Sequence, residues 1–146
     1  MENEMKIFLA GTIDDGKSTD WQKEVKDLLG DTDIIVYNPR RYDFPEHPLE
    51  EDVVRQIRWE QEHLDDADLI VMNFLDGSLS PITLLEMGLY AKSGKLMVFC
   101  NENYWRYTNV KETCRKYHIT LYNDNSVENI VKHIKNVYET EFWLNK

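Results

Sequence analysis

The chain has 146 residues, of which 42% are hydrophobic, a composition typical of a folded domain with its own core. Its 17 Lys and Arg residues against 27 Asp and Glu give a net charge of −10, which argues against a nucleic-acid polymer as partner because phosphate binding needs clustered cations. No apolar run reaches membrane length and no leader pattern is visible, so we expect a soluble, cytoplasmic protein.

Short apolar segments alternate with amphipathic ones along the chain. Strands are expected at residues 6–10, 33–37, 69–72, 96–99 and 119–122. Helices are expected at residues 20–29, 49–66 and 80–91, in a short segment after a loop at 101–109, and at 126–137. Strict alternation of strand and helix predicts one α/β domain over residues 1–146, with a doubly wound, five-stranded parallel sheet and helices on both faces.

The carboxyl ends of these strands are the expected binding edge, because ligands of open α/β sheets bind there. Gly11 and Thr12 follow the first strand and could let a ligand approach the backbone. Arg40 follows the second strand and could meet a phosphate or a base, and Asp76 follows the third and could touch a sugar. Trp21 could stack a base. Ordinary turns, solvated charges and core packing would produce the same pattern.

Cysteine and histidine residues are few and dispersed. Cys100 and Cys114 are too few for a disulfide framework, and the four His residues have no partner at metal-ligand spacing. The sequence therefore predicts two reduced thiols, no metal site and no cofactor.

Glu86 is the only charged residue in the apolar segment 80–91. Ser80 is a favourable N-cap and Pro81 suits the first turn, so a helix is expected to begin there. Its apolar stripe consists of Ile82, Leu85 and Leu89. A helix that is apolar nearly all round is expected to be buried. A carboxylate on it has to be paired, protonated or used in chemistry, unless it lies on an exposed edge.

Residues 11–18 match the phosphate-binding pattern G-x-x-x-x-G-K-[ST], between a strand and a helix. In a true P-loop, backbone N–H groups and Lys17 would hold a triphosphate. Asp14 and Asp15 would place two negative charges against those phosphates. We therefore interpret the segment as a polar loop over a ligand cleft.

Several motifs, in their order and spacing, resemble those of the nucleoside 2-deoxyribosyltransferase family and its close relatives. They are FLAGTI at residues 8–13, WQ at 21–22, NPRR at 38–41, QIRWE at 56–60, ADLI at 67–70, SPITLLEMGLYA at 80–91 and NV at 109–110. The resemblance implies a flavodoxin-like, Rossmann-like fold. It also implies an enzyme that breaks or exchanges the N-glycosidic bond of (deoxy)nucleosides.

The resemblance assigns roles to individual residues. Glu86 matches the family's nucleophile, and Glu60 lies where the family has an Asp that handles the leaving base. From the residues alone, Glu60 would be an ordinary solvated helix charge. Asn109 matches a sugar-contacting residue that the family donates from a neighbouring subunit. The resemblance thus implies a homodimer or larger homo-oligomer that binds a small nucleoside or nucleotide.

Ser80 departs from the family's transferases, which carry an Asp six positions before the nucleophile. Related enzymes that hydrolyse nucleoside 5′-monophosphates have a Ser there, in contact with phosphate. The competing interpretation is that Ser80 only caps its helix. Three functions remain open: N-deoxyribosyl transfer between bases, hydrolysis of a nucleoside or nucleotide N-glycosidic bond, and non-catalytic nucleotide binding.

Overall fold

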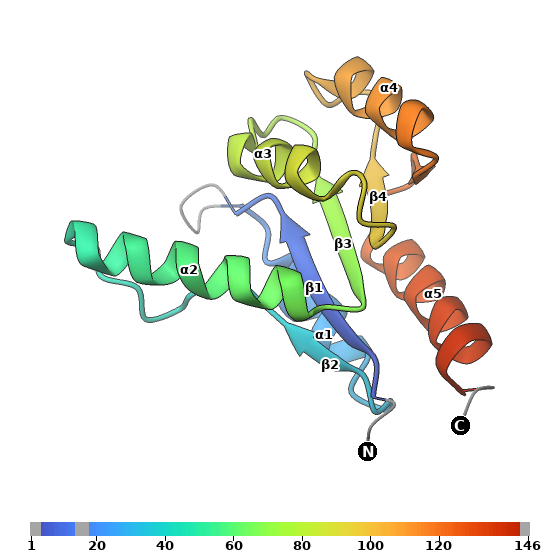
Figure 1. Cartoon of the computed structure of the whole chain (residues 1–146), viewed down its shortest axis with the longest axis horizontal. Helices are drawn as coiled ribbons and strands as arrows, with labels where there is room; N and C mark the ends of the chain where they lie inside the picture. Colours follow the sequence, from blue (N-terminus) through green and yellow to red (C-terminus); the bar gives the residue numbers. More distant parts are fainter. Residues whose placement is uncertain (1–3, 14–17, 144–146) are drawn as a thin grey trace.

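The computed structural model describes residues 4–13 and 18–143, which form a five-stranded parallel sheet in the order β2-β1-β3-β4-β5 (Figure 1). The strands are β1 (Lys6–Gly11), β2 (Ile35–Tyr37), β3 (Leu69–Phe74), β4 (Leu96–Cys100) and β5 (Thr120–Tyr122). The strand order reverses between β1 and β3, as in flavodoxin-like folds. The predicted doubly wound parallel sheet is confirmed.

Helices cover both faces of this sheet. They are α1 (Trp21–Leu28), α2 (Glu50–Asp66), α3 (Pro81–Tyr90), α4 (Tyr107–Tyr117) and α5 (Val127–Val137), which continues into the π-helical segment η2 (Tyr138–Trp143). α1 and α5 pack against each other on one face, and α2, α3 and α4 lie on the other (Figure 1). None of the helices in the described part of the chain is both long and apolar enough to cross a membrane.

Alternation of side chains along each strand builds a separate core on each face. In β3, Ile70, Met72 and Phe74 pack under α2, α3 and α4, whereas Val71 packs under α1 and α5. Strands covered on both faces have to be apolar on both sides, which is the pattern of β3 and β4. The position of a residue along its strand therefore decides on which face of the sheet it can act.

The fourth helix begins earlier than the sequence indicates, and the expected loop through residue 109 is wrong. α4 starts at Tyr107, so Asn109 lies in its first turn. The N-cap residue, Arg106, makes no side-chain cap, which is why no start signal is readable there. Tyr104 anchors this start instead: it is buried against Phe74, with ring centroids 5.1 Å apart, and its carbonyl accepts from the Tyr107 N–H at 2.9 Å.

The expectation of a fully buried third helix is wrong for one of its faces. Ile82, Leu85 and Leu89 are 57%, 58% and 63% exposed. A helix that lies on one face of a sheet buries the side that meets the strands, and these three side chains lie on the side away from them. The buried side chains of α3 are Thr83, Glu86 and Met87.

Candidate active site

Two carboxyl groups meet between α2 and α3. Glu86 lies in the second turn of α3 and is only 8% exposed. Glu60, on α2, is partly buried and lies close enough to Glu86 for their carboxyl groups to share a hydrogen bond. The fold thus brings together the two residues to which the resemblance assigns catalytic roles.

Burial and mutual repulsion keep this pair partly protonated near neutral pH. Desolvation raises the pKa of Glu86 to about 8, and the neighbouring charge of Glu60 adds to the rise. Desolvation also raises the pKa of Glu60, although hydrogen bonds with Gln56 and Glu86 oppose that rise. The two groups therefore titrate as a unit, and the pair retains a proton near neutral pH. A carboxylate beside a carboxylic acid is the combination that a nucleophile and a general acid require.

Gln56 fixes the position of the Glu60 carboxyl. Its side-chain amide donates to Glu60 Oε2 at 2.9 Å and to the Pro39 carbonyl at 3.1 Å. Its own Oε1 accepts from the Arg41 guanidinium at 2.8 Å. Gln56 received no role from the sequence motifs, although its i,i+4 spacing from Glu60 on a helix is a readable signal.

Three buried hydroxyl groups form a cluster at the start of α3. Thr12 Oγ1 lies 2.6 Å from Ser80 Oγ and 3.0 Å from Ser78 Oγ, and the two serine hydroxyls are 2.9 Å apart. Thr12 Oγ1 also accepts from the Leu75 backbone N–H at 3.0 Å. Ser78 also belongs to this hydroxyl cluster, although no sequence motif pointed to it. Its position two residues before Ser80 is the only sequence signal that it could lie there.

The interpretation that the Ser80 side chain caps its helix is wrong. Ser80 occupies the N-cap position of α3 with φ +49° and ψ +50°, and its side chain makes no cap hydrogen bond. Its hydroxyl turns to Thr12 and Ser78 instead. The first backbone N–H groups of α3 therefore receive no acceptor from the cap residue.

Gly11 is required by the close approach of β1 to β3. Its φ is +154°, and a Cβ at this position would lie 2.4 Å from the Asn73 carbonyl oxygen and 2.6 Å from the Trp21 ring. A larger residue would push the strands apart and displace Thr12, whose N–H donates to the same carbonyl at 3.0 Å. Gly11 thereby positions the hydroxyl cluster.

Trp21 and Arg40 make hydrogen bonds inside the protein, to described residues that follow β1. Trp21 is 1% exposed, and its Nε1–H donates to the Thr12 carbonyl at 3.1 Å. Arg40 is 7% exposed and donates to the carbonyls of Ser18 at 2.7 Å and Thr19 at 3.2 Å. This arrangement speaks against base stacking by Trp21 and against a phosphate or base contact by Arg40.

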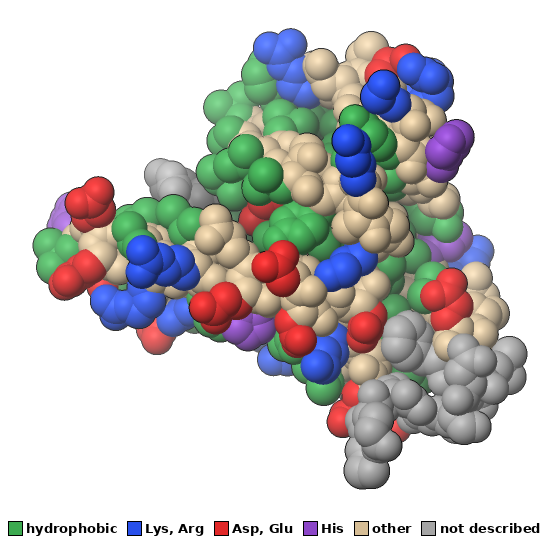
Figure 2. Space-filling model, in the orientation of Figure 1, with side chains coloured by type: hydrophobic (Ala, Val, Ile, Leu, Met, Phe, Trp, Pro, Cys, Tyr) green, Lys and Arg blue, Asp and Glu red, His purple; other side chains and the backbone are tan. Residues whose placement is uncertain are grey.

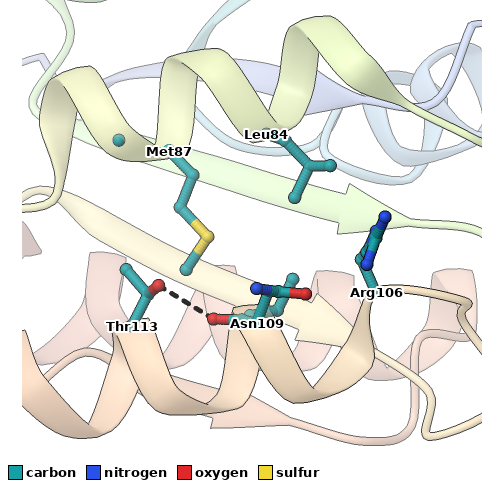
Figure 3. Close-up of a pocket in the computed structure, with 7 residues that line it drawn as sticks. Leu84, Met87, Arg106, Asn109 and Thr113 are labelled. Carbon is teal, nitrogen blue, oxygen red and sulfur yellow. Dashed lines mark hydrogen bonds between the residues drawn. The ribbon is translucent and has the colours of Figure 1, made fainter.

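Asn109 lines a groove of about 330 Å³ between α3 and α4, together with Leu84, Met87 and Arg106 (Figure 3). Glu86 does not line this groove, because it lies on the flank of α3 that faces α2. Asn109 is exposed and does not join the carboxyl pair of its own chain.

The remaining candidates lie apart from these contacts. Asp76 is exposed, in the turn that follows β3. Residues 14–17 of the P-loop-like segment, which include Lys17, lie outside the described residues. Within residues 4–13 and 18–143, no group of three His, Cys, Asp or Glu side chains is arranged to hold a metal ion. Cys100 and Cys114 are free and buried, and burial raises their pKa values to about 12 and about 11.

Asn73 is the one polar side chain in the described residues whose buried amide atoms have no hydrogen-bond partner. It is fully buried at the carboxyl end of β3. Alternation along the strand directs it to the same face as Val71, under α1 and α5 and away from Glu86. The sequence gives no hint of this, because an Asn at a strand end reads as a turn residue.

Replacing Asn73 by Leu, a somewhat larger side chain with the same branching at Cγ, is expected to raise the free energy of unfolding by about 1 kcal/mol, because it removes an unsatisfied buried amide. Urea denaturation at constant m-value measures the change. A fall in stability would contradict the expectation and would mean that the amide has a partner, such as an internal water. Val71→Ala, which only removes apolar contacts on the same face, serves as the destabilising control.

Comparisons with known proteins identify a family and a fold. The sequence profile of a family described as nucleoside 2-deoxyribosyltransferase like matches residues 4–104. A 2-deoxyribosyltransferase from the psychrotolerant bacterium Bacillus psychrosaccharolyticus has a similar structure, with a TM-score of 0.53 and 22% identity over 64% of this chain and 71% of that one. A conserved protein from Enterococcus faecalis V583 is similar with a TM-score of 0.51 and 14% identity, over 89% and 87%. No curated protein sequence matches the chain.

Proposed function

Because the chain belongs to the nucleoside 2-deoxyribosyltransferase-like family, we propose that it cleaves or exchanges the N-glycosidic bond of (deoxy)nucleosides through a covalent glycosyl-Glu86 intermediate. The observation that carries the proposal is the contact between the buried Glu86 and Glu60, two carboxyl groups with raised pKa values on neighbouring helices. Structural ion pairs join opposite charges, whereas two like charges brought together in a partly buried place favour a catalytic role.

The proposed reaction consists of two displacements at the sugar C1′. The Glu86 carboxylate forms a bond to C1′ while the bond from C1′ to the base nitrogen breaks and its electron pair leaves with the base. Glu60, as the acid, gives its proton to that base. Glu60 then accepts a proton from water or from a second base, which attacks C1′ and releases Glu86. Two displacements on the same carbon retain its configuration.

The shared proton of the pair suits this sequence of steps. The pKa of each carboxyl depends on the charge of the other, so the proton can lie on either group. Positive charge that develops at C1′ stabilises the Glu86 carboxylate and leaves the proton on Glu60, where the departing base needs it. Gln56 holds Glu60 in place through the 2.9 Å hydrogen bond.

A second candidate, hydrolysis of nucleoside 5′-monophosphates, is favoured by the hydroxyl cluster at the start of α3. Thr12, Ser78 and Ser80 place three hydroxyl groups within 3.0 Å of one another at a helix N-terminus. Hydroxyl donors and the helix dipole stabilise an anion such as a 5′-phosphate. An Asp at position 80 would repel it and would favour a 5′-hydroxyl.

Ser80→Asp is therefore expected to lower kcat/KM for a nucleoside monophosphate by at least about 10-fold relative to the matching nucleoside. Asp is tolerated where φ is positive, so the backbone at Ser80 can stay as it is. Steady-state kinetics on matched substrate pairs in both proteins measure the ratio. Ser93→Asp, which adds the same charge at an exposed serine beyond the other end of α3, is the matched control. If the ratio of kcat/KM for the two substrates is unchanged in Ser80→Asp, base exchange between nucleosides is favoured over hydrolysis of monophosphates.

The reaction class is tested by product analysis on a panel of nucleosides and nucleoside monophosphates. Free base and free sugar indicate hydrolysis, whereas a new nucleoside that forms only when a second base is present indicates transfer. Binding of these ligands without release of any base would contradict the catalytic proposal and would support a nucleotide-binding role.

A further inference from the structure

Two aromatic side chains just before α4 hold the backbone of the segment that leads into α3. The Tyr104 hydroxyl donates to the Leu79 carbonyl at 2.6 Å, and the Trp105 Nε1–H donates to the same oxygen at 3.2 Å. Tyr104 is 2% exposed, so packing fixes its ring, whereas Trp105 is 54% exposed. Both lone pairs of the Leu79 carbonyl are therefore occupied, and its direction is fixed.

The direction of the Leu79 carbonyl constrains the backbone of Ser80. The peptide unit between these two residues is planar, so a carbonyl that cannot rotate also fixes the orientation of the Ser80 N–H. Ser80 has φ +49° and ψ +50°, a left-handed conformation that is costly for a residue with a Cβ. Thr12 and Ser78 hold its side chain through their hydroxyl groups, and the aromatic pair holds its backbone.

Without these contacts Ser80 would be free to adopt the ordinary N-cap conformation. An N-cap serine has an extended backbone, and its hydroxyl oxygen accepts from the N–H of the second or third helical residue. In α3 these residues are Ile82 and Thr83, because Pro81 is the first. The ordinary cap would thus occupy the same N–H groups that a phosphate at the start of the helix needs.

We infer that Tyr104 and Trp105 are positioning residues that keep the first N–H groups of α3 free of the Ser80 side chain and open to a 5′-phosphate. Neither aromatic side chain has to touch the substrate, since both act through the Leu79 carbonyl. The inference rests on the proposed function, and within it on the hydrolysis of nucleoside 5′-monophosphates.

The aromatic pair also brings a cation to this end of α3. The Arg106 guanidinium lies over the Trp105 ring, 4.1 Å from its centroid, and has no ion-pair partner within residues 4–13 and 18–143. Figure 3 shows Arg106 beside Leu84, toward the N-terminal end of α3. Several Lys and Arg side chains lie over α4 and the segment before it in Figure 2. A phosphate at the start of α3 would therefore meet less repulsion than the net charge of −10 suggests.

The test removes one donor at a time. Tyr104→Phe deletes only the hydroxyl group and leaves the ring packed against Phe74, and Trp105→Phe deletes the second donor at an exposed position. Tyr107→Phe is the matched control, because it also deletes a tyrosine hydroxyl near the start of α4. That hydroxyl accepts from Asn123, beyond β5, at 2.8 Å. All three variants should keep the wild-type circular dichroism spectrum.

The kinetic readout compares a nucleoside monophosphate with its matching nucleoside. For the monophosphate, Tyr104→Phe and Trp105→Phe are expected to raise KM by at least about five-fold and to change kcat by less than about two-fold, because the lost contacts position the phosphate and not the reacting carbon. The nucleoside should keep both constants within about two-fold. Equal changes for the two substrates, or changes no larger than those in Tyr107→Phe, would overturn the inference.

Binding of ribose 5-phosphate, followed by NMR at the backbone amides of Ile82 and Thr83, is a readout that needs no turnover. Tyr107→Phe should bind it as the wild type does, and Tyr104→Phe at least about five-fold more weakly. Ribose, which lacks the phosphate, should leave these amides unshifted. If ribose 5-phosphate also leaves them unshifted in the wild type, the inference is overturned. If binding follows the expected pattern but no substrate releases a base, the positioning role stands and the proposed function fails.

Discussion

Replacing Glu86 by Gln is expected to lower the rate of base release by a factor of at least about 10³, which corresponds to about 4 kcal/mol of transition-state stabilisation. Gln keeps nearly the volume of Glu and its hydrogen-bonding ability. It has no carboxylate to attack C1′, so the glycosyl-enzyme cannot form. Because Glu86 is 8% exposed, solvent cannot easily supply a substitute nucleophile at the same place.

The measurement is the initial rate of free base production, with Glu62→Gln as the matched control. Glu62 lies on α2 two residues from Glu60 but is exposed, so its replacement should leave the rate within about two-fold, as is usual for surface substitutions. Mass spectrometry of a quenched reaction should detect a sugar adduct on the wild type and none on Glu86→Gln. A variant that turns over at the wild-type rate would show that Glu86 is not the nucleophile.

The second large effect concerns the pH dependence of stability. Burial and Glu60 raise the pKa of Glu86 to about 8 in the folded chain, against 4.5 as its ordinary value. Between these values the folded state holds a proton that the unfolded state has released. The free energy of unfolding should therefore fall as pH rises from about 5 to 8, with a slope that approaches about 1.4 kcal/mol per pH unit.

Glu86→Gln removes this linkage because an amide does not titrate. Its stability should fall less steeply over the same pH range, because only Glu60 of the pair still titrates, and the variant should exceed the wild type by the largest margin near pH 8. The variant would then be more stable and inactive, a combination that a merely structural carboxyl would not give. Urea denaturation at several pH values measures both curves. Parallel curves for the two proteins would contradict the raised pKa of Glu86.

The sheet could be predicted from the sequence because each strand is a short apolar run set between helix signals. The N-terminal ends of α3 and α5 carry Ser80–Pro81 and Ser126, which are residue types that favour a helix start. The start of α4 could not be found in this way, because a buried Tyr104 and not a cap fixes it. Tertiary packing of that kind leaves no local pattern.

The candidate site was less readable than the fold. Glu86 stands out as a charge in an apolar helix, but its contact with Glu60 depends on how α2 crosses the sheet, which spacing alone does not give. Trp21 and Arg40 look like ligand-binding residues in the sequence, but in the structure both side chains donate hydrogen bonds to backbone carbonyls of their own chain. The exposed stripe of α3 could not be predicted either, since apolar periodicity does not tell a core from an interface.

The left-handed backbone at Ser80 sets the range of variants that a protein engineer can screen at this position. Residues with a branched or bulky side chain are strained where φ is +49°, whereas Gly, Asn and Asp accept it. A screen for altered phosphate preference therefore needs only these three residue types in place of all twenty amino acids. They span no charge, an amide and a full negative charge, so one degenerate codon can sample the electrostatics of the proposed phosphate site while the fold stays constant.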